Sequence, residues 1–346
     1  MIKAKSNPDF NRIISVLNHR KKQEPVLFEF FLNKNIYEYF TGKDIEMQPG
    51  NLAKLKIIID AYYKAGYDFV IIPSWLTDTL TFQIDEIHKK DTRSLNEGKT
   101  ITDEKSFEKY PWPEPINDDY AVFQELKKML PDGMKCIATL PGGVLENVID
   151  LVGFERLCLL TLENPELCKQ IFDAVGTCLL DYYRVVASFD HVGALFTNDD
   201  WGFKTQTMLP PESMREFVFP WHKAMVEVIH QNNKPAILHS CGNLNAVMNE
   251  VIDDMKFDGK HSFEDGIVPV EQAYEVWGDR IAIMGGIGLD FLARKTPEEI
   301  KTRAQKMLEI SFDDGGFALG SGNSIPEYIP LQNYLALISV VNEKRF

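Results

Sequence analysis

The chain has 346 residues, of which 45% are hydrophobic and 25% are charged, a composition typical of one large α/β domain or two ordinary ones. Its net charge of −14 argues against a nucleic-acid partner, because phosphate backbones are bound by clustered Lys and Arg side chains. No apolar run reaches the roughly 20 residues that a transmembrane helix needs, and the amino terminus lacks the apolar core of a signal peptide. We therefore expect a cytoplasmic protein that binds neither membranes nor nucleic acid. Its five scattered cysteines are expected to be reduced thiols.

Short β-branched or apolar runs alternate with helical periodicity along the chain, which predicts strands and helices in alternation. The eight predicted strands are residues 26–31, 67–73, 135–141, 192–198, 235–241, 257–263, 280–286 and 316–322. Alternation of this kind predicts a parallel sheet with helices outside. Eight units without a Rossmann glycine fingerprint favour a closed (β/α)8 TIM barrel over an open doubly wound sheet. No composition break divides the chain, so we expect a single domain over residues 1–346.

Several segments between the strands have specific predictions of their own. Residues 12–17 place apolar side chains at helical spacing and predict an amino-terminal helical extension that packs on the barrel. Thr296-Pro297-Glu298-Glu299 predicts a helix that begins with Thr at the N-cap, and Asn164-Pro165-Glu166 predicts another. The long polar segment 77–116 follows the second strand, and its length predicts a lid or wall at the barrel mouth.

The stretch HSCGN, residues 239–243, ends the fifth predicted strand and contains His239 and Cys241. Residues i and i+2 of an extended chain point to the same side, so the imidazole and the thiol can converge on one point. Zinc accepts both nitrogen and sulfur ligands, and this spacing fits two of them. An H-x-C stretch also arises by chance, and it is then a strand-end histidine followed by a buried thiol.

The other strand ends help to decide between these alternatives. Asp199 and Asp200 follow the fourth predicted strand, Glu264 follows the sixth and Asn323 follows the eighth. In barrels of this type the chemistry gathers at the carboxyl ends of the strands, so these polar groups are expected to face one cavity. Their accumulation beside the histidine and the cysteine favours a metal site.

The run from Gly202 to Asn243 resembles the uroporphyrinogen decarboxylase superfamily, and especially its corrinoid-linked zinc methyltransferase branch. Residues 265–271 and 285–287 are similar to further parts of that family, and the resemblance extends over nearly the whole chain. It implies the same barrel that the strand pattern predicts. It also implies zinc as a cofactor and a corrinoid, or cobalamin, carried by a partner protein.

Two branches of the superfamily are separated by their motifs. The decarboxylases carry an arginine-rich glycine loop near the amino terminus that binds porphyrinogen carboxylates, whereas residues 28–34, FEFFLNK, contain neither arginine nor glycine. The zinc methyltransferases use H-x-C and a later cysteine, and this chain matches the pair with His239 and Cys241 but has Asn323 at the later position. The similar cobalamin-independent methionine synthases use a glutamate ligand, which implies Glu264, 23 residues after Cys241, as the replacement.

Further residues near the strand ends are candidates for handling the substrate. Asp199 and Asp200 are expected to orient it or to donate a proton, the alternative being that they cap the helix after Gly202. Trp201 and Phe203 are candidate walls for an aromatic ring, although such residues are more often part of a core. Asn323 is expected to line the pocket without completing a thiolate site.

The resulting hypothesis is a zinc-dependent methyltransferase. It would move a methyl group from a small donor, expected to be an O-methyl compound, to a corrinoid on a partner protein, because one thiolate among harder ligands favours oxygen substrates. A decarboxylase of the uroporphyrinogen type or of another small acid is one alternative, and a non-catalytic barrel that binds a small ligand is another. A homodimer is compatible with each of these.

Overall fold

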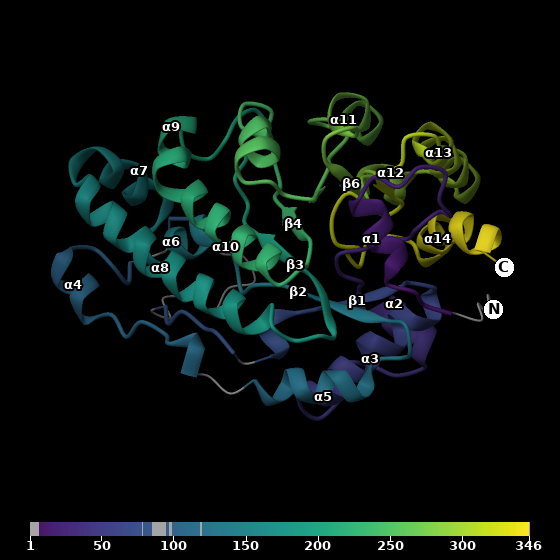
Figure 1. Cartoon of the computed structure of the whole chain (residues 1–346), viewed down its shortest axis with the longest axis horizontal. Helices are drawn as coiled ribbons and strands as arrows, with labels where there is room; N and C mark the ends of the chain where they lie inside the picture. The colour runs from purple at the N-terminus through teal and green to yellow at the C-terminus, as the bar shows by residue number, and fades with distance from the viewer. Residues whose placement is uncertain (1–6, 78, 85–94, 97–98, 118–119, 346) are drawn as a thin grey trace.

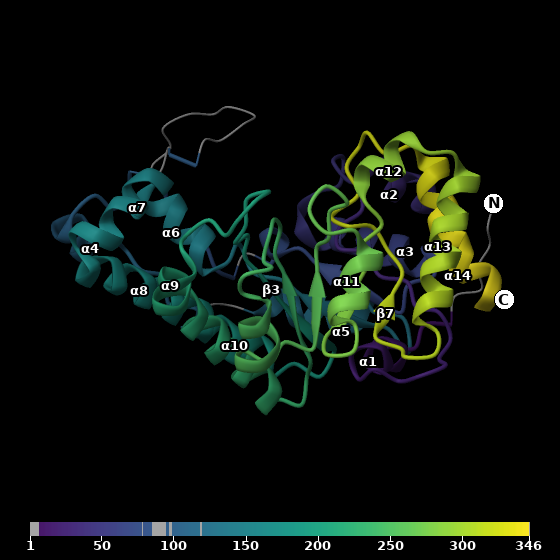
Figure 2. The ribbon, with the colours of Figure 1, turned by 90° about the horizontal axis from the view of Figure 1, so that it is seen from above.

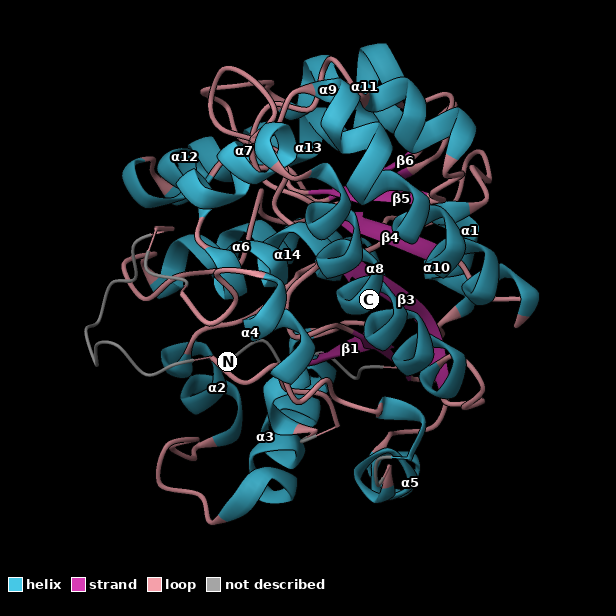
Figure 3. Ribbon diagram, turned by 90° about the vertical axis from the view of Figure 1, so that its left-hand side faces the viewer, coloured by secondary structure: helices cyan, strands magenta, loops and turns pink. Residues whose placement is uncertain are grey.

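The computed structural model describes residues 7–77, 79–84, 95–96, 99–117 and 120–345. Its centre is a parallel sheet in which seven strands follow one another in chain order (Figures 1 and 3). The strands are β1 (Phe69–Ile72), β2 (Lys135–Ala138), β3 (Val192–Asn198), β4 (Ala236–His239), β5 (Gly259–His261), β6 (Ala282–Met284) and β7 (Phe317–Ala318). Their side chains are almost all buried, as expected for a parallel sheet covered by helices.

Helices fill the connections between these strands and cover the sheet. They are α1 (Asn11–Leu17), α2 (Lys34–Thr41), α3 (Gly50–Ala65), η1 (Ser74–Leu76), α4 (Glu104–Lys109), η2 (Pro115–Asn117), α5 (Ala121–Met129), α6 (Val144–Val152), α7 (Phe154–Glu163), α8 (Pro165–Val186), α9 (Pro211–Ser213), η3 (Met214–Val218), α10 (Phe219–Gln231), η4 (Glu250–Asp254), α11 (Val270–Trp277), α12 (Leu289–Arg294), α13 (Pro297–Ser311) and α14 (Leu331–Arg345). Figure 2 shows α8 and α10 on one side of the strands, with α13 and α14 on the other. In the part of the chain that the structure describes, no helix has the length and apolar character needed to span a membrane.

The first predicted strand, residues 26–31, is where the structure differs from a closed eight-stranded barrel. Leu27 forms a single parallel bridge with Leu319, next to β7, and the described residues contain no ladder between this segment and β1. The Phe30 carbonyl accepts a hydrogen bond from the Tyr62 hydroxyl over 2.7 Å, so a side chain satisfies this backbone group without a strand neighbour. The sheet is therefore curled and TIM-barrel-like, but it is not closed.

The remaining element predictions fit the structure well. Each of the other seven predicted strand ranges contains one observed strand, and α1 forms the predicted amino-terminal helix. Thr296 caps α13 by accepting a hydrogen bond from the Glu299 amide over 3.3 Å, and Asn164 caps α8 through the Leu167 amide over 3.1 Å. Both N-caps are confirmed.

The predicted lid, residues 77–116, lies partly outside the described residues, which omit 78, 85–94 and 97–98. The described part includes α4, and it leads into η2, which packs against α8. The Cys178 thiol of α8 donates to the Pro113 carbonyl over 3.2 Å. Residues 113–117 therefore lie on the helical layer.

Candidate metal centre at the carboxyl ends of the strands

The carboxyl ends of β3, β4 and β5 lie level with one another. Asn198 pairs with His239, and His239 pairs in turn with His261. The alignment continues one residue further, because the Asp199 amide donates to the His239 carbonyl and the Ser240 amide to the His261 carbonyl, each over 2.9 Å. The loops that follow these three strands therefore start side by side.

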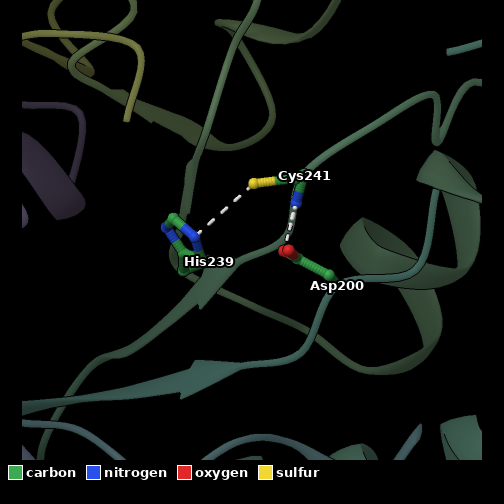
Figure 4. Close-up of side chains that lie close together, drawn as sticks. All are labelled: Asp200, His239 and Cys241. Carbon is green, nitrogen blue, oxygen red and sulfur yellow. Dashed lines mark hydrogen bonds between the residues drawn. The ribbon is translucent and has the colours of Figure 1, made fainter. Parts of the chain in front are cut away.

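Asp200, His239 and Cys241 form a compact cluster where these loops begin (Figure 4). Their ligand atoms all lie within 4.8 Å of one another, and no other such group of three is found among the described residues. The Cys241 amide donates to Asp200 Oδ1 over 2.8 Å, and Cys241 Sγ lies 3.8 Å from His239 Nε2. Carboxylate oxygen, imidazole nitrogen and thiolate sulfur are all zinc ligands, so the chemistry of this donor set fits zinc.

Gly242 explains why the loops can approach so closely. Its φ is +84°, a conformation that side-chain-bearing residues rarely adopt, and a Cβ at this position would lie 2.0 Å from the Gly202 carbonyl oxygen. The Gly202 amide also donates to the Cys241 carbonyl over 3.2 Å. A glycine after the cysteine thus lets the loop after β3 bring Asp200 against Cys241.

The surroundings of the cluster set its protonation states. Burial lowers the pKa of His239 to about 4, so its imidazole is neutral and offers a lone pair. Burial, followed by the nearby Asp200 carboxylate, raises the pKa of the Cys241 thiol to about 12. Asn323 Nδ2 donates to Cys241 Sγ over 3.2 Å, so this amide lies directly beside the thiol. Metal ligation by this thiol would require that its proton be released.

Asp199 is buried and faces a helix rather than the cluster. Its carboxylate accepts hydrogen bonds from the Leu145 and Glu146 amides, each over 3.0 Å, and lies 2.9 Å from His222 Nε2. Asp199 therefore caps the amino terminus of α6, where a negative charge is favourable. The sequence suggests capping of the helix after Gly202, whereas in the structure Asp199 caps α6.

Three other predicted site residues lie outside the cluster. Trp201 is fully buried, with its ring centroid 4.8 Å from that of His222, so it is placed as a core residue. Phe203 is 39% exposed and packs against the Phe154 ring at 5.6 Å. Glu264 is exposed and lines a pocket next to the cluster. Its role as a ligand stays a prediction, while Asp200 supplies the carboxylate within the cluster.

Lys260 is a buried residue that the sequence analysis did not assign to the site. Its Nζ donates to the Ser240 carbonyl over 3.3 Å and also to the Ser262 carbonyl, so it links the ends of β4 and β5. Burial lowers its pKa to about 8. The available signal was a lysine at the centre of a predicted strand, because the strands of a parallel sheet are buried and a buried lysine must find acceptors or a charge.

Comparison with known proteins shows a family match over most of the chain. A sequence profile described as "Uroporphyrinogen decarboxylase (URO-D)" matches residues 43–344. Two curated proteins, from Methanosarcina barkeri and its strain Fusaro, are both named "Methylcobamide:CoM methyltransferase MtaA" and are 28% identical over 195 residues. The match covers 56% of this chain and 54% of each relative, so the chain spans about half the length of these relatives.

Solved structures show the same fold at lower identity. A methyltransferase from Methanosarcina mazei has a TM-score of 0.72 at 19% identity, covering 97% of this chain and 98% of that one. A putative vitamin-B12 independent methionine synthase from Listeria monocytogenes has a TM-score of 0.50 at 12% identity, covering 94% and 99%. These two likenesses establish the fold alone.

Proposed function

The chain belongs to the uroporphyrinogen decarboxylase family, and from this premise we propose that it is a zinc-dependent methyltransferase that works with a corrinoid protein. The observation on which this depends is the cluster of Asp200, His239 and Cys241 at the strand ends. Three protein ligands and an open fourth position are the arrangement of a catalytic zinc site. The names of the curated relatives, which are methyltransferases, support the same class of reaction.

His239, Cys241 and Asp200 would hold the zinc, with Glu264 as the alternative source of the oxygen ligand. Bound zinc supplies Lewis acidity, which stabilises negative charge on a heteroatom. The protein contributes the neutral His239 imidazole, the Cys241 thiol and a pocket next to the cluster, which Ser262 and Glu264 help to line. These groups would hold the substrate heteroatom in place while its methyl group is transferred.

We assign the methyl donor to the class of small O-methyl compounds and the acceptor to a reduced corrinoid. In that reaction the bond between the methyl carbon and oxygen breaks, and a bond between carbon and cobalt forms with the electron pair of Co(I). The electron pair of the broken bond stays on oxygen, which takes up one proton. A donor set with one sulfur, Cys241, and one carboxylate, Asp200, favours oxygen as the activated atom, because thiol activation is typical of sites richer in sulfur.

Porphyrinogen decarboxylation fits the amino-terminal segment less well. At the level of the metal cluster, the Phe30 ring stacks on His239 at 4.2 Å, and the Phe28 ring meets His261 at 5.2 Å. Aromatic rings therefore flank these two histidines, and residues 28–34 supply Lys34 as their one cation for the carboxylates of such a substrate. The net charge of −14 adds to this mismatch.

The first test is metal content. Purified wild type should contain about one zinc per chain, and Cys241→Ala should lose most of it, because removal of one of three ligands weakens the site strongly. Cys158→Ala is the matched control, since Cys158 is also a half-buried free thiol but lies on α7. Undiminished zinc in Cys241→Ala would contradict the proposal.

The second test is the reaction itself. Protein, cob(I)alamin and a panel of methoxylated aromatic compounds are mixed, and the visible spectrum is followed for methylcobalamin. Formation of methylcobalamin by wild type, and its loss in Cys241→Ala but not in Cys158→Ala, is the expected result. Release of carbon dioxide from a small acid, without methylcobalamin from any donor, would support the decarboxylase alternative instead.

A further inference from the structure

A chain of hydrogen bonds runs from the metal cluster through a second histidine to the loop after β7. His239 Nδ1 lies 2.8 Å from His261 Nδ1, and His261 Nε2 lies 3.3 Å from the Ser321 carbonyl oxygen. Both imidazoles are buried, and both lie at the ends of paired strands. His239 thus contacts His261 through Nδ1 and faces Cys241 through its other ring nitrogen, Nε2.

The Ser321 carbonyl sets the donor-to-acceptor direction of these hydrogen bonds. A carbonyl oxygen only accepts, so His261 Nε2 must donate to it. His261 is buried, and its two ring nitrogens face the His239 ring and the Ser321 carbonyl, neither of which is an anion that could balance a positive charge, so the neutral imidazole with a single N–H fits this position. His261 Nδ1 is then an acceptor, and His239 Nδ1 is the donor that it faces. Consequently His239 Nε2, which lies 3.8 Å from Cys241 Sγ, keeps its lone pair.

At the Ser321 end of this hydrogen-bond series, the loop is held by a buried carboxyl group. The Ser321 amide lies 3.2 Å from Glu29 Oε2, and Ser321 Oγ lies 2.6 Å from Glu29 Oε1. Ser321 Oγ also contacts the Asn323 carbonyl, and one hydroxyl proton can serve only one of these two acceptors. A neutral Glu29 resolves this conflict: it donates to Ser321 Oγ, which donates to Asn323. The loop that orients His261 is thus anchored on residues 26–31, the segment that precedes α2.

We propose that His261 is a positioning residue, which fixes the tautomer and the ring orientation of His239 so that Nε2 is presented to the metal, with Glu29 and Ser321 as its support. This inference rests on the proposed function, since it deepens the role of His239 as a ligand. Histidine ligands depend on the partner of their other ring nitrogen, because that partner sets which nitrogen binds the metal. In this chain the partner is a second imidazole.

The tautomers can be measured without any metal. Long-range proton–nitrogen NMR correlations of the full-length, zinc-free protein distinguish the protonated from the unprotonated ring nitrogens of each histidine, and His→Phe variants assign the signals. We expect His239 to be protonated at Nδ1 and His261 at Nε2. The opposite tautomer at either residue would overturn the inference, whatever the protein does with zinc.

Zinc affinity then tests the consequence, with competing chelators as the readout. His261→Phe keeps a ring against Phe28 but removes the acceptor, and we expect its zinc affinity to fall roughly tenfold to a hundredfold. His261→Asn places an amide oxygen near the former Nδ1, so it should restore much of that loss. His230→Phe is the control, because His230 lies on α10 and pairs with Asp258, which is not part of the cluster.

The outcomes separate the two proposals. Equal zinc affinity in wild type and His261→Phe would overturn the positioning role and leave the zinc site intact. An equal loss in His261→Phe and His261→Asn would overturn it as well, because a role in packing alone predicts no rescue. Absence of zinc binding in the wild type would instead overturn the proposed function, and the NMR measurement would then decide the inference alone.

Discussion

Replacement of Glu29 by glutamine should leave the protein folded and change how its stability depends on pH. Glu29 is fully buried, and burial raises the pKa of its carboxyl group from 4.5 to about 8. Three buried tyrosines, Tyr62, Tyr67 and Tyr334, lie close enough to interact with this group. The carboxyl group therefore keeps its proton at neutral pH. A glutamine amide has the shape of the neutral acid, and it can donate to Ser321 Oγ and accept from the Ser321 amide, giving up the 3.3 Å contact in which Glu29 Oε1 accepts from the Phe30 amide.

The size of the effect follows from the shift in pKa. A carboxyl group whose pKa is raised on folding contributes stability that is fully present below pH 4.5 and is lost as the pH rises through about 8. Each pH unit within this window changes the free energy of unfolding by up to about 1.4 kcal/mol. Between pH 5 and pH 7 the wild type should therefore lose about 2.5 kcal/mol through Glu29, whereas Glu29→Gln has no such loss.

The assay is urea unfolding followed by circular dichroism at pH 5 and at pH 7. Other titrating groups are shared by the two proteins, so the difference in unfolding free energy, variant minus wild type, isolates Glu29 and should rise by about 2.5 kcal/mol. Glu38→Gln, on the exposed face of α2, should show no such rise. A pH-independent difference for Glu29→Gln would refute the neutral Glu29. Unfolding of the variant at neutral pH would contradict the expectation that the amide can replace the neutral acid.

Two further predictions concern the loops that assemble the cluster. Gly242→Ala should lower the free energy of unfolding by at least about 1–2 kcal/mol, measured by urea unfolding, because alanine is strained at φ +84° and its Cβ would meet the Gly202 carbonyl. Gly266→Ala is the control, since a Cβ there meets nothing within 4 Å. Asp200→Asn should weaken zinc binding more than Glu264→Gln does, measured by chelator competition, and the reverse order would make Glu264 the oxygen ligand.

Much of the fold could be predicted because a parallel sheet leaves a strong local signal. Buried strands read as apolar runs, and the caps of α8 and α13 have side-chain signatures that depend on neighbouring residues only. Closure of the barrel is different, because it depends on partners that are far apart in the chain. The apolar pattern of residues 26–31 is that of a strand, but Tyr62, on α3, takes the Phe30 carbonyl. No local sequence pattern reveals a contact between residues this far apart in the chain.

The candidate site, too, was predictable only where the signal is local. His239 and Cys241 were predicted because their alternation along one strand places them on one side. The choice between Asp199 and Asp200 was not predicted, because adjacent residues point in different directions and only the folded structure shows that the first amides of α6 reach Asp199. The partnership of His239 with His261 depends on the register between β4 and β5, and register is a property of the folded sheet rather than of either segment.

The position of Asn323 links the sequence departure to the choice of substrate. This residue stands at the position where the resemblance to the zinc methyltransferases implies a later cysteine, and its amide donates to Cys241 Sγ over 3.2 Å. A hydrogen bond to a thiolate withdraws charge from the sulfur, so the asparagine both removes one sulfur donor and weakens the other. In the proposed zinc site, the carboxylate of Asp200 would replace the lost negative charge with a harder oxygen ligand. Each of these changes reduces charge donation to a bound cation and leaves it a stronger Lewis acid, which supports the assignment of an oxygen atom as the activated atom.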